Sequence, residues 1–158
     1  MSSAVHAVEA SGVARFMREA LYAYPAAEVV HIVGLALLFG SIAIVDLRLL
    51  GLGARIPLKP LVAFAVPWSL VGFIVAASAG LLMFTAHAEE FLTQPVFMLK
   101  MGLILAGGIN AAVLHTGVLA RMVNEPDAEI ARKLRFAAFF SLLTWLGVIA
   151  CGRMLAYL

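Results

Sequence analysis

Long apolar runs alternate with short polar breaks along the chain. A membrane span needs about 20 apolar residues, and four segments reach that length: 27–50, 61–87, 96–120 and 135–157. Between them lie a Gly and Pro loop at 51–60, a short polar turn at 88–95 and a charged loop at 121–135. Because such short connections make consecutive spans antiparallel neighbours, we expect an all-α, integral membrane four-helix up-down bundle, with residues 1–158 in a single domain.

The segment before the first span has a different pattern. Residues 9–23 place apolar side chains at helical spacing while their charged side chains fall elsewhere. This pattern predicts an N-terminal amphipathic helix that lies on the membrane surface and contacts lipid. Pro25 then suits the first turn of the following span, and His6 lies in the tail that precedes the amphipathic helix.

Composition supports the membrane assignment and narrows the function classes. Hydrophobic residues make up 64% of the chain, charged residues only 13%, and the mean hydropathy is +1.05. The basic residues stand at segment ends instead of forming one face with interleaved aromatics, so nucleic acid is not indicated as a partner. The single cysteine, Cys151, excludes an intrachain disulfide and a cysteine-based metal cluster.

Positive charge near the span ends predicts the orientation in the membrane. The loops after the first and third spans carry seven basic residues: Arg48, Arg55, Lys59, Arg121, Arg132, Lys133 and Arg135. The opposite side holds fewer, and the polar turn at 88–95 has no Lys or Arg. Because cytoplasmic loops are enriched in Lys and Arg, we expect both termini on the periplasmic side of a bacterial inner membrane.

Polar side chains within the spans fall into two layers. His31, His87, Lys100 and Arg153 bring one nitrogen-bearing side chain from each span to the outer layer. Asp46 and His115 form a sparser inner layer, about 22 Å away at a rise of 1.5 Å per residue. Polar groups are expensive in hydrocarbon, so each layer is a candidate functional site.

The outer layer has the donors that a haem b requires. Two histidines on facing helices can ligate iron from both sides, as in other helix bundles. We expect His31 and His87 to be these ligands, with Gly34 and Gly80 among the small residues that make room for the macrocycle. Lys100 and Arg153 stand near the aqueous edge, where cations would bind the haem propionates.

Other interpretations of the same residues stay open. The histidines can be interfacial residues, the small residues can serve close helix packing, and Lys100 and Arg153 can extend to the interface. Copper is the alternative cofactor, because thioether and imidazole ligands suit Cu(I) and methionines gather near His87 at Met83, Met98, Met101 and Met154.

The inner layer allows several roles. His115 could ligate a second haem, although the spans hold no further histidine at that depth. Asp46 could accept a hydrogen bond from that imidazole or pair with Arg48 or Arg121. Because a histidine can gain or lose a proton near neutral pH, Asp46 and His115 could also transfer protons, or could simply form a structural contact.

Two segments resemble a known group of proteins. HIVGLALLFGSIAIVDLRLLG in the first span and AGLLMFTAHAEEFLTQPVFMLKMGLILAGGINAAVLH across the next two are similar to small bacterial inner-membrane proteins with a domain of unknown function. The resemblance covers most of residues 27–120 and implies the four-span topology. The histidine pattern separately resembles four-helix b-type cytochromes of the b561 type, which pass electrons between a quinol or other donor and an acceptor.

The leading hypothesis is therefore a membrane b-type cytochrome with one haem near the periplasmic side, or with a second haem in the inner layer. We expect an electron-transfer module more than a complete enzyme, because haem supplies the redox chemistry and no catalytic nucleophile is evident. A quinol or a periplasmic protein would be its redox partner, within a homo-oligomer or a larger complex. The competing hypothesis is a copper-binding or cofactor-free transporter or accessory subunit.

Overall fold

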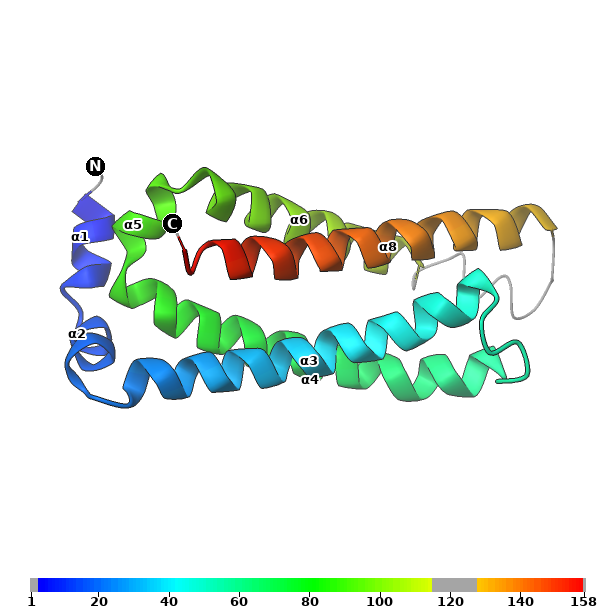
Figure 1. The fold of residues 1–158 in the computed structure, drawn as a ribbon, viewed down its shortest axis with the longest axis horizontal. Coiled ribbons are helices and arrows are strands. Elements are labelled where there is room, and N and C mark those ends of the chain that lie inside the picture. Colours follow the sequence, from blue (N-terminus) through cyan, green and yellow to red (C-terminus); the bar gives the residue numbers. More distant parts are fainter. Residues whose placement is uncertain (1–2, 115–127, 158) are drawn as a thin grey trace. The chain divides into compact units, whose positions relative to one another are not determined.

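The computed structural model describes residues 3–114 and 128–157, and within them the fold is all-α, as predicted. The helices are α1 (Ser3–Glu9), α2 (Gly12–Glu19), α3 (Ala23–Leu50), α4 (Leu58–Ala86), α5 (Ala88–Thr93), α6 (Pro95–Val113) and α8 (Ala128–Met154) (Figure 1).

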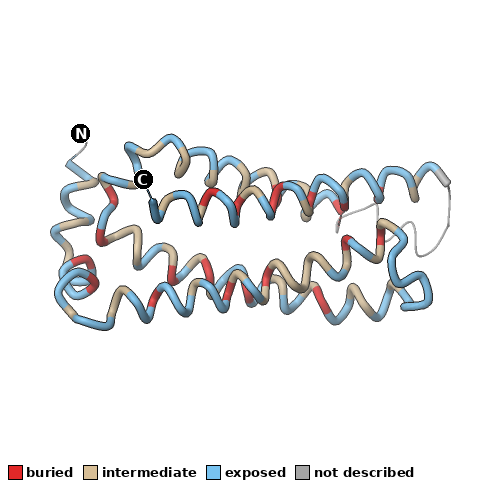
Figure 2. Tube along the Cα trace, in the orientation of Figure 1, coloured by how far each residue is buried: buried red, intermediate tan, exposed pale blue. Residues whose placement is uncertain are grey.

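Four of the described helices are long and apolar enough to cross a membrane: α3, α4, α6 and residues Glu129–Met154 of α8. Their outward side chains include large apolar groups that a soluble protein would bury, such as Phe64 (70% exposed), Leu105 (65%) and Phe136 (74%). Buried positions are a minority along the traced chain (Figure 2). The protein is therefore a multi-pass membrane protein, which confirms the prediction.

The helix boundaries differ from the predicted spans. The α3 helix begins at Ala23, four residues before the predicted start, because Pro25 is accommodated in its first turn. The α8 helix begins at Ala128, so residues 128–134 are helical where a charged loop was predicted. An ion pair between Lys133 Nζ and Glu129 Oε1, 2.7 Å apart on one helical face, supports this extra turn.

The polar turn predicted at 88–95 contains a short helix, α5. Its first turn holds Glu89 and Glu90, and carboxylates favour helix formation there because they complement the positive end of the helix dipole. The predicted turn was therefore wrong for residues 88–93.

The amphipathic helix predicted at 9–23 is shorter in the structure, where α2 spans Gly12–Glu19. Glu9 ends a second helix, α1, which the sequence analysis did not predict. The two helices are separate because Ser11 begins α2 as an N-cap: its hydroxyl accepts a hydrogen bond from the backbone N–H of Ala14 at 3.2 Å. The α2 helix is amphipathic, as predicted, with Ala14 and Met17 buried and Phe16 exposed. Met17 packs with Ala27 and Ala86.

The chain divides into two compact units, each described here by itself. The first unit comprises Met1–Phe39 and Trp68–Pro95, and the second comprises Gly40–Pro67 and Val96–Leu158. In the first unit, antiparallel halves of α3 and α4 pack together beside α1, α2 and α5. In the second unit, the remaining halves of α3 and α4 accompany α6 and α8 around a cluster of Leu49, Leu114, Leu134 and Ala138.

The turn between α3 and α4 is held by Arg48. Its Nε donates to the carbonyl of Ile56 (2.7 Å) and its Nη2 to that of Ala54 (3.0 Å). Gly51 and Gly53 have φ angles of 110° and 64°, which favour glycine because other residues would be strained. Arg48 therefore binds the turn, and among the described residues it forms no ion pair with Asp46.

Candidate functional site

His31 lies on α3 with its ring directed onto α4, in the first unit. Its Nδ1 is 2.6 Å from the carbonyl oxygen of Ala76. A carbonyl oxygen can only accept a hydrogen bond, so Nδ1 carries the proton and, in the neutral ring, Nε2 carries the lone pair. A Cβ added to Gly80 would lie 3.2 Å from Cε1 of His31, so the imidazole packs on this glycine. The structure thus places Gly80 beside His31, and its role in making room for a macrocycle stays a prediction.

His87 follows the last residue of α4 and is the N-cap of α5. Its half-exposed ring meets Tyr24 edge to face, with centroids 5.9 Å apart, and its Nδ1 is 3.6 Å from Glu90 Oε2. His87 therefore lies at the end of the first unit, next to the start of α3.

The structure does not bring His31 and His87 together. On α4, His31 contacts Gly80, which lies seven residues before His87. On α3, His87 contacts Tyr24, which lies seven residues before His31. Seven residues of helix correspond to about 10 Å, whereas two nitrogens on opposite sides of one metal ion are about 4 Å apart.

Gly34 has a different role from the one expected of it. A Cβ at Gly34 would lie 2.5 Å from the backbone N of Ala76, and one at Gly72 would lie 2.4 Å from that of Leu38. At this level the backbones of α3 and α4 are in contact, so these glycines allow close helix packing and leave no space for a macrocycle between the two helices.

Lys100 and Arg153 belong to the second unit. Lys100 on α6 reaches α8, where a Cβ added to Gly152 would be 3.5 Å from Nζ. Arg153 hydrogen bonds to the hydroxyl of Tyr157 and lies over that ring, with Cζ 4.6 Å from the centroid. Their role as propionate ligands of a haem bound by His31 stays a prediction.

Asp46 is buried in the second unit. It is 3% exposed, it hydrogen bonds to Ser141 of α8, and its Oδ2 has no hydrogen-bond partner among the described residues. The ion pair expected with Arg48 is therefore wrong, since Arg48 binds the α3–α4 turn. His115 and Arg121, the other expected partners, lie outside the described residues.

A methionine of the copper alternative has a packing role. Met83 lies against the cluster of Met17, Ala27 and Ala86, which suits the use of methionine as a flexible filler of apolar cores. Packing within the first unit therefore explains why a methionine stands at this position.

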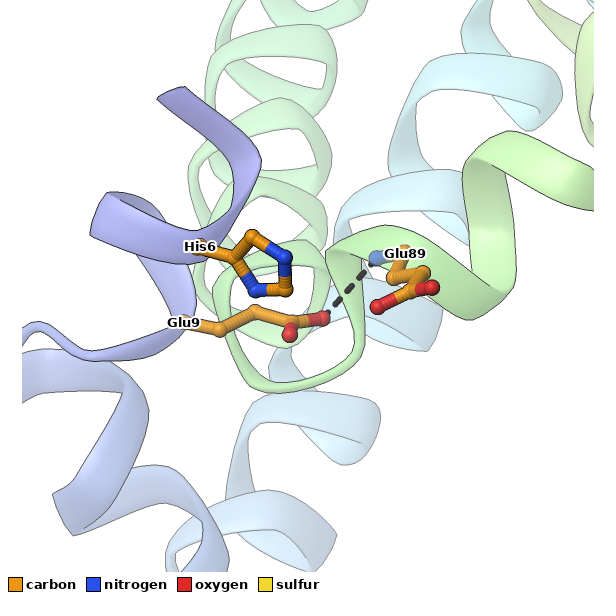
Figure 3. A group of neighbouring side chains, drawn as sticks. All are labelled: His6, Glu9 and Glu89. Atoms are coloured by element: carbon orange, nitrogen blue, oxygen red, sulfur yellow. Dashed lines mark hydrogen bonds between the residues drawn. The ribbon is translucent and has the colours of Figure 1, made fainter. Parts of the chain in front are cut away.

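A cluster that the sequence analysis missed lies at the start of the chain. His6 and Glu9 on α1 and Glu89 on α5 converge, with one ligand atom from each within 4.8 Å of the others (Figure 3). Glu9 Oε1 also accepts a hydrogen bond from the backbone N–H of Glu89 at 2.8 Å. Imidazole nitrogen and carboxylate oxygen can bind a divalent cation.

Arg18 holds this cluster in place without neutralising it through an ion pair. Its Nη2 donates to the backbone carbonyl of Glu9 (2.8 Å) and its Nη1 to that of Ala86 (3.0 Å). The i,i+3 spacing of His6 and Glu9 was visible in the sequence and indicates a shared helical face. Glu89 is 80 residues beyond Glu9, and no sequence pattern linked the two.

Comparison with known proteins gives a family without an activity. No curated protein and no solved structure matches the chain. The resemblance to b561-type cytochromes therefore rests on the histidine pattern alone. The match to a family of unknown function, DUF6644, extends over residues 13–158. Since this is nearly the whole chain, the protein belongs to that family.

Proposed function

We propose that this protein is a membrane haem b protein that transfers electrons, in which His31 would be a ligand of the haem iron. The observation that carries the proposal is the 2.6 Å hydrogen bond between Nδ1 of His31 and the carbonyl of Ala76. Metal-ligating histidines commonly donate their second ring N–H to such an acceptor, which sets the tautomer and the ring orientation. The bond directs Nε2 to act as the ligating nitrogen.

The chain's own groups would orient the cofactor, while haem supplies the one-electron chemistry. Gly80 supports the His31 ring, and the close α3–α4 contact at Gly34 stiffens the helix that carries it. Lys100 and Arg153 belong to the second unit, and their role as propionate ligands stays a sequence-based prediction. We do not propose His87 as a ligand of the same iron, since its contacts lie about 10 Å along the helices from those of His31.

The wider setting belongs to the same proposal. The basic loops support a bacterial inner membrane with both termini periplasmic, and the redox partner would be a quinol or a periplasmic protein. A homo-oligomer or a complex subunit suits a chain of this size. A second haem at His115 and proton transfer with Asp46 stay predictions, because His115 lies outside the described residues.

The test is the reduced-minus-oxidised visible spectrum of the detergent-purified, full-length protein. We expect b-type bands in the wild type and in His87→Ala, and their loss in His31→Ala. The two histidine variants are matched controls for each other, and circular dichroism checks that both stay helical.

Each departure from this pattern has a definite meaning. A colourless wild-type protein from haem-replete cells, or bands that survive His31→Ala, would contradict the proposal. Bands lost in both variants would instead favour one iron shared by His31 and His87 and overturn our assignment of His87.

A second candidate function, divalent metal binding, is favoured by the 4.8 Å cluster of His6, Glu9 and Glu89. Two carboxylates with one imidazole suit Zn²⁺ or Mn²⁺ better than Cu(I), which prefers sulfur. Such an ion would cross-link α1 to α5 and leave a coordination position for water or substrate.

Calorimetric titration of the full-length protein with Zn²⁺ tests this candidate. We expect one site that is lost in His6→Ala and in Glu9→Gln but kept in Glu90→Gln, a matched change beside Glu89. Chelation should lower the melting temperature of the metal-loaded protein, since a ligand of the native state stabilises it. Unchanged Zn²⁺ binding in His6→Ala would rule the cluster out as the metal site. If the protein bound neither haem nor a divalent metal, a cofactor-free transporter or accessory subunit would be favoured.

A further inference from the structure

Among the residues that the structure describes, Asp46 is the most deeply buried acidic or basic side chain, and haem binding by His31 does not use it. It lies on α3, four residues before the helix ends at Leu50, within a candidate membrane span. Only 3% of its surface is exposed. Its helix neighbours Val45 and Leu49 belong to the apolar cluster of the second unit, so Asp46 is surrounded by a nonpolar environment.

The hydrogen-bond partners of Asp46 satisfy only part of its carboxyl group. Ser141 of α8 bonds to it, whereas the buried Oδ2 has no partner among the described residues. Buried polar atoms are nearly always hydrogen-bonded, so an unsatisfied carboxyl oxygen requires an explanation. On α6, the amide of Asn110 donates through Nδ2 to the carbonyl of Ala137 at 3.2 Å.

The basic side chains that the structure describes on the neighbouring elements do not pair with Asp46. On its own helix, Arg48 donates to the turn carbonyls of Ala54 and Ile56. Lys133 of α8 pairs with Glu129 at 2.7 Å. The remaining described cations of the α3–α4 turn, α4 and the start of α8 have exposed side chains: Arg55, Lys59, Arg132 and Arg135. The described part of α6 near Asn110 carries no charged residue.

We propose that Asp46 and Ser141 form an intramembrane site for a small monovalent cation, either a proton or Na⁺. An unpaired carboxylate buried within a membrane span is costly, and a bound cation removes that cost. The donor set, carboxylate oxygen with hydroxyl oxygen, is hard and suits such cations. The site is in the second unit and uses none of the residues assigned to haem or divalent metal.

Dicyclohexylcarbodiimide distinguishes the two cations, because this apolar reagent enters membrane sites and reacts with the protonated carboxyl group. The acid adds across one C=N bond, its proton going to nitrogen and its oxygen to carbon. The O-acylisourea then rearranges to a stable N-acylurea, with no leaving group and no change of oxidation state. Peptide mass spectrometry locates the adduct.

In sodium-free buffer we expect Asp46 of the detergent-purified, full-length protein to be modified. At constant pH and ionic strength, Na⁺ in place of choline should slow the modification at least tenfold if the site binds Na⁺. An unchanged rate assigns the site to the proton. An Asp46 peptide recovered unmodified in sodium-free buffer would overturn the proposal.

Two serine and threonine changes on α8 separate this site from a structural contact. Ser141→Ala removes the second oxygen and should change the rate of Asp46 modification several-fold, or weaken the protection by Na⁺. Thr144→Val is the matched control, since Thr144 is also buried but its Cγ2 faces Gly107, 3.5 Å from an added Cβ. Equal rates in both variants and the wild type would remove Ser141 from the site and overturn the proposal.

The result does not depend on the proposed haem. His31→Ala should leave the modification of Asp46 unchanged, and a colourless wild-type protein can still be modified at Asp46. The failure of one proposal is therefore distinguishable from the failure of the other.

Discussion

The α3–α4 contact of the first unit and the α6–α8 contact of the second use glycine in opposite ways. In the first, a Cβ on Gly34 or Gly72 would lie 2.5 or 2.4 Å from a backbone nitrogen of the facing helix. In the second, a Cβ on Gly107 would lie 3.2 Å from the Trp145 ring, and one on Gly147 would lie 3.1 Å from Leu103 Cδ1.

The difference decides how each contact can respond to change. Backbone atoms in a helix cannot move alone, because each is tied to its neighbours by the helix hydrogen bonds. A side chain can rotate or shift by a few tenths of an ångström. The glycines between α3 and α4 therefore set the distance between the two helices, while those between α6 and α8 leave space that a side chain of the facing helix fills.

Gly72→Ala should have the largest effect. The new methyl group would require α3 and α4 to separate along their contact, and overpacking of this kind costs about 3 kcal/mol. Thermal unfolding of the detergent-purified protein, followed by circular dichroism, would show the loss. A melting temperature equal to that of the wild type would mean that the backbones do not touch at this glycine.

Gly107→Ala should have an intermediate effect of about 1 kcal/mol, because the methyl group meets the edge of the Trp145 ring instead of backbone. Trp145 is buried, so its ring can shift only slightly. Tryptophan fluorescence during unfolding would report both the stability and the displaced ring. A cost as large as that of Gly72→Ala would remove the distinction between the two contacts.

Gly108→Ala should have the smallest effect. This residue is adjacent to Gly107, yet a Cβ there would have no neighbour within 4 Å among the described residues, apart from its own turn of helix. The stability should stay within about 0.5 kcal/mol of the wild type, with a small gain favoured by the helix propensity of alanine. A large loss, measured by the same unfolding experiment, would show that another surface covers this face.

The spans were predictable because their signal is local. An apolar run of sufficient length needs no information about its neighbours. Pro95 marks a break by its fixed φ angle, and the glycines of the α3–α4 turn do so by their freedom to adopt a positive φ. The boundary errors arose where a polar stretch was itself helical. The Glu129–Lys133 pair and the acidic first turn of α5 stabilise helices that hydropathy alone assigns to loops.

The depth of the histidines was not predictable to the accuracy that a shared iron requires. Counting from a predicted start at residue 27 puts His31 about one turn inside the first span, whereas α3 begins at Ala23. His87 lies just beyond the end of α4. Each residue of helix adds about 1.5 Å. Errors of a few residues at the ends of α3 and α4 therefore placed His31 and His87 at the same depth in the sequence analysis, although they lie at different depths.

The chain's composition and apolar periodicity were sufficient to establish a multi-pass, all-α membrane protein, because burial in lipid acts on each segment separately. They also singled out His31 and Asp46, since a polar group in a membrane helix is costly wherever it lies. Packing alone decided which groups meet. His31 meets the carbonyl of Ala76, Gly34 meets the backbone of α4, and Asp46 meets Ser141. Glu89 meets His6 and Glu9. Such contacts depend on the rotation and spacing of two helices, and no single segment contains that information.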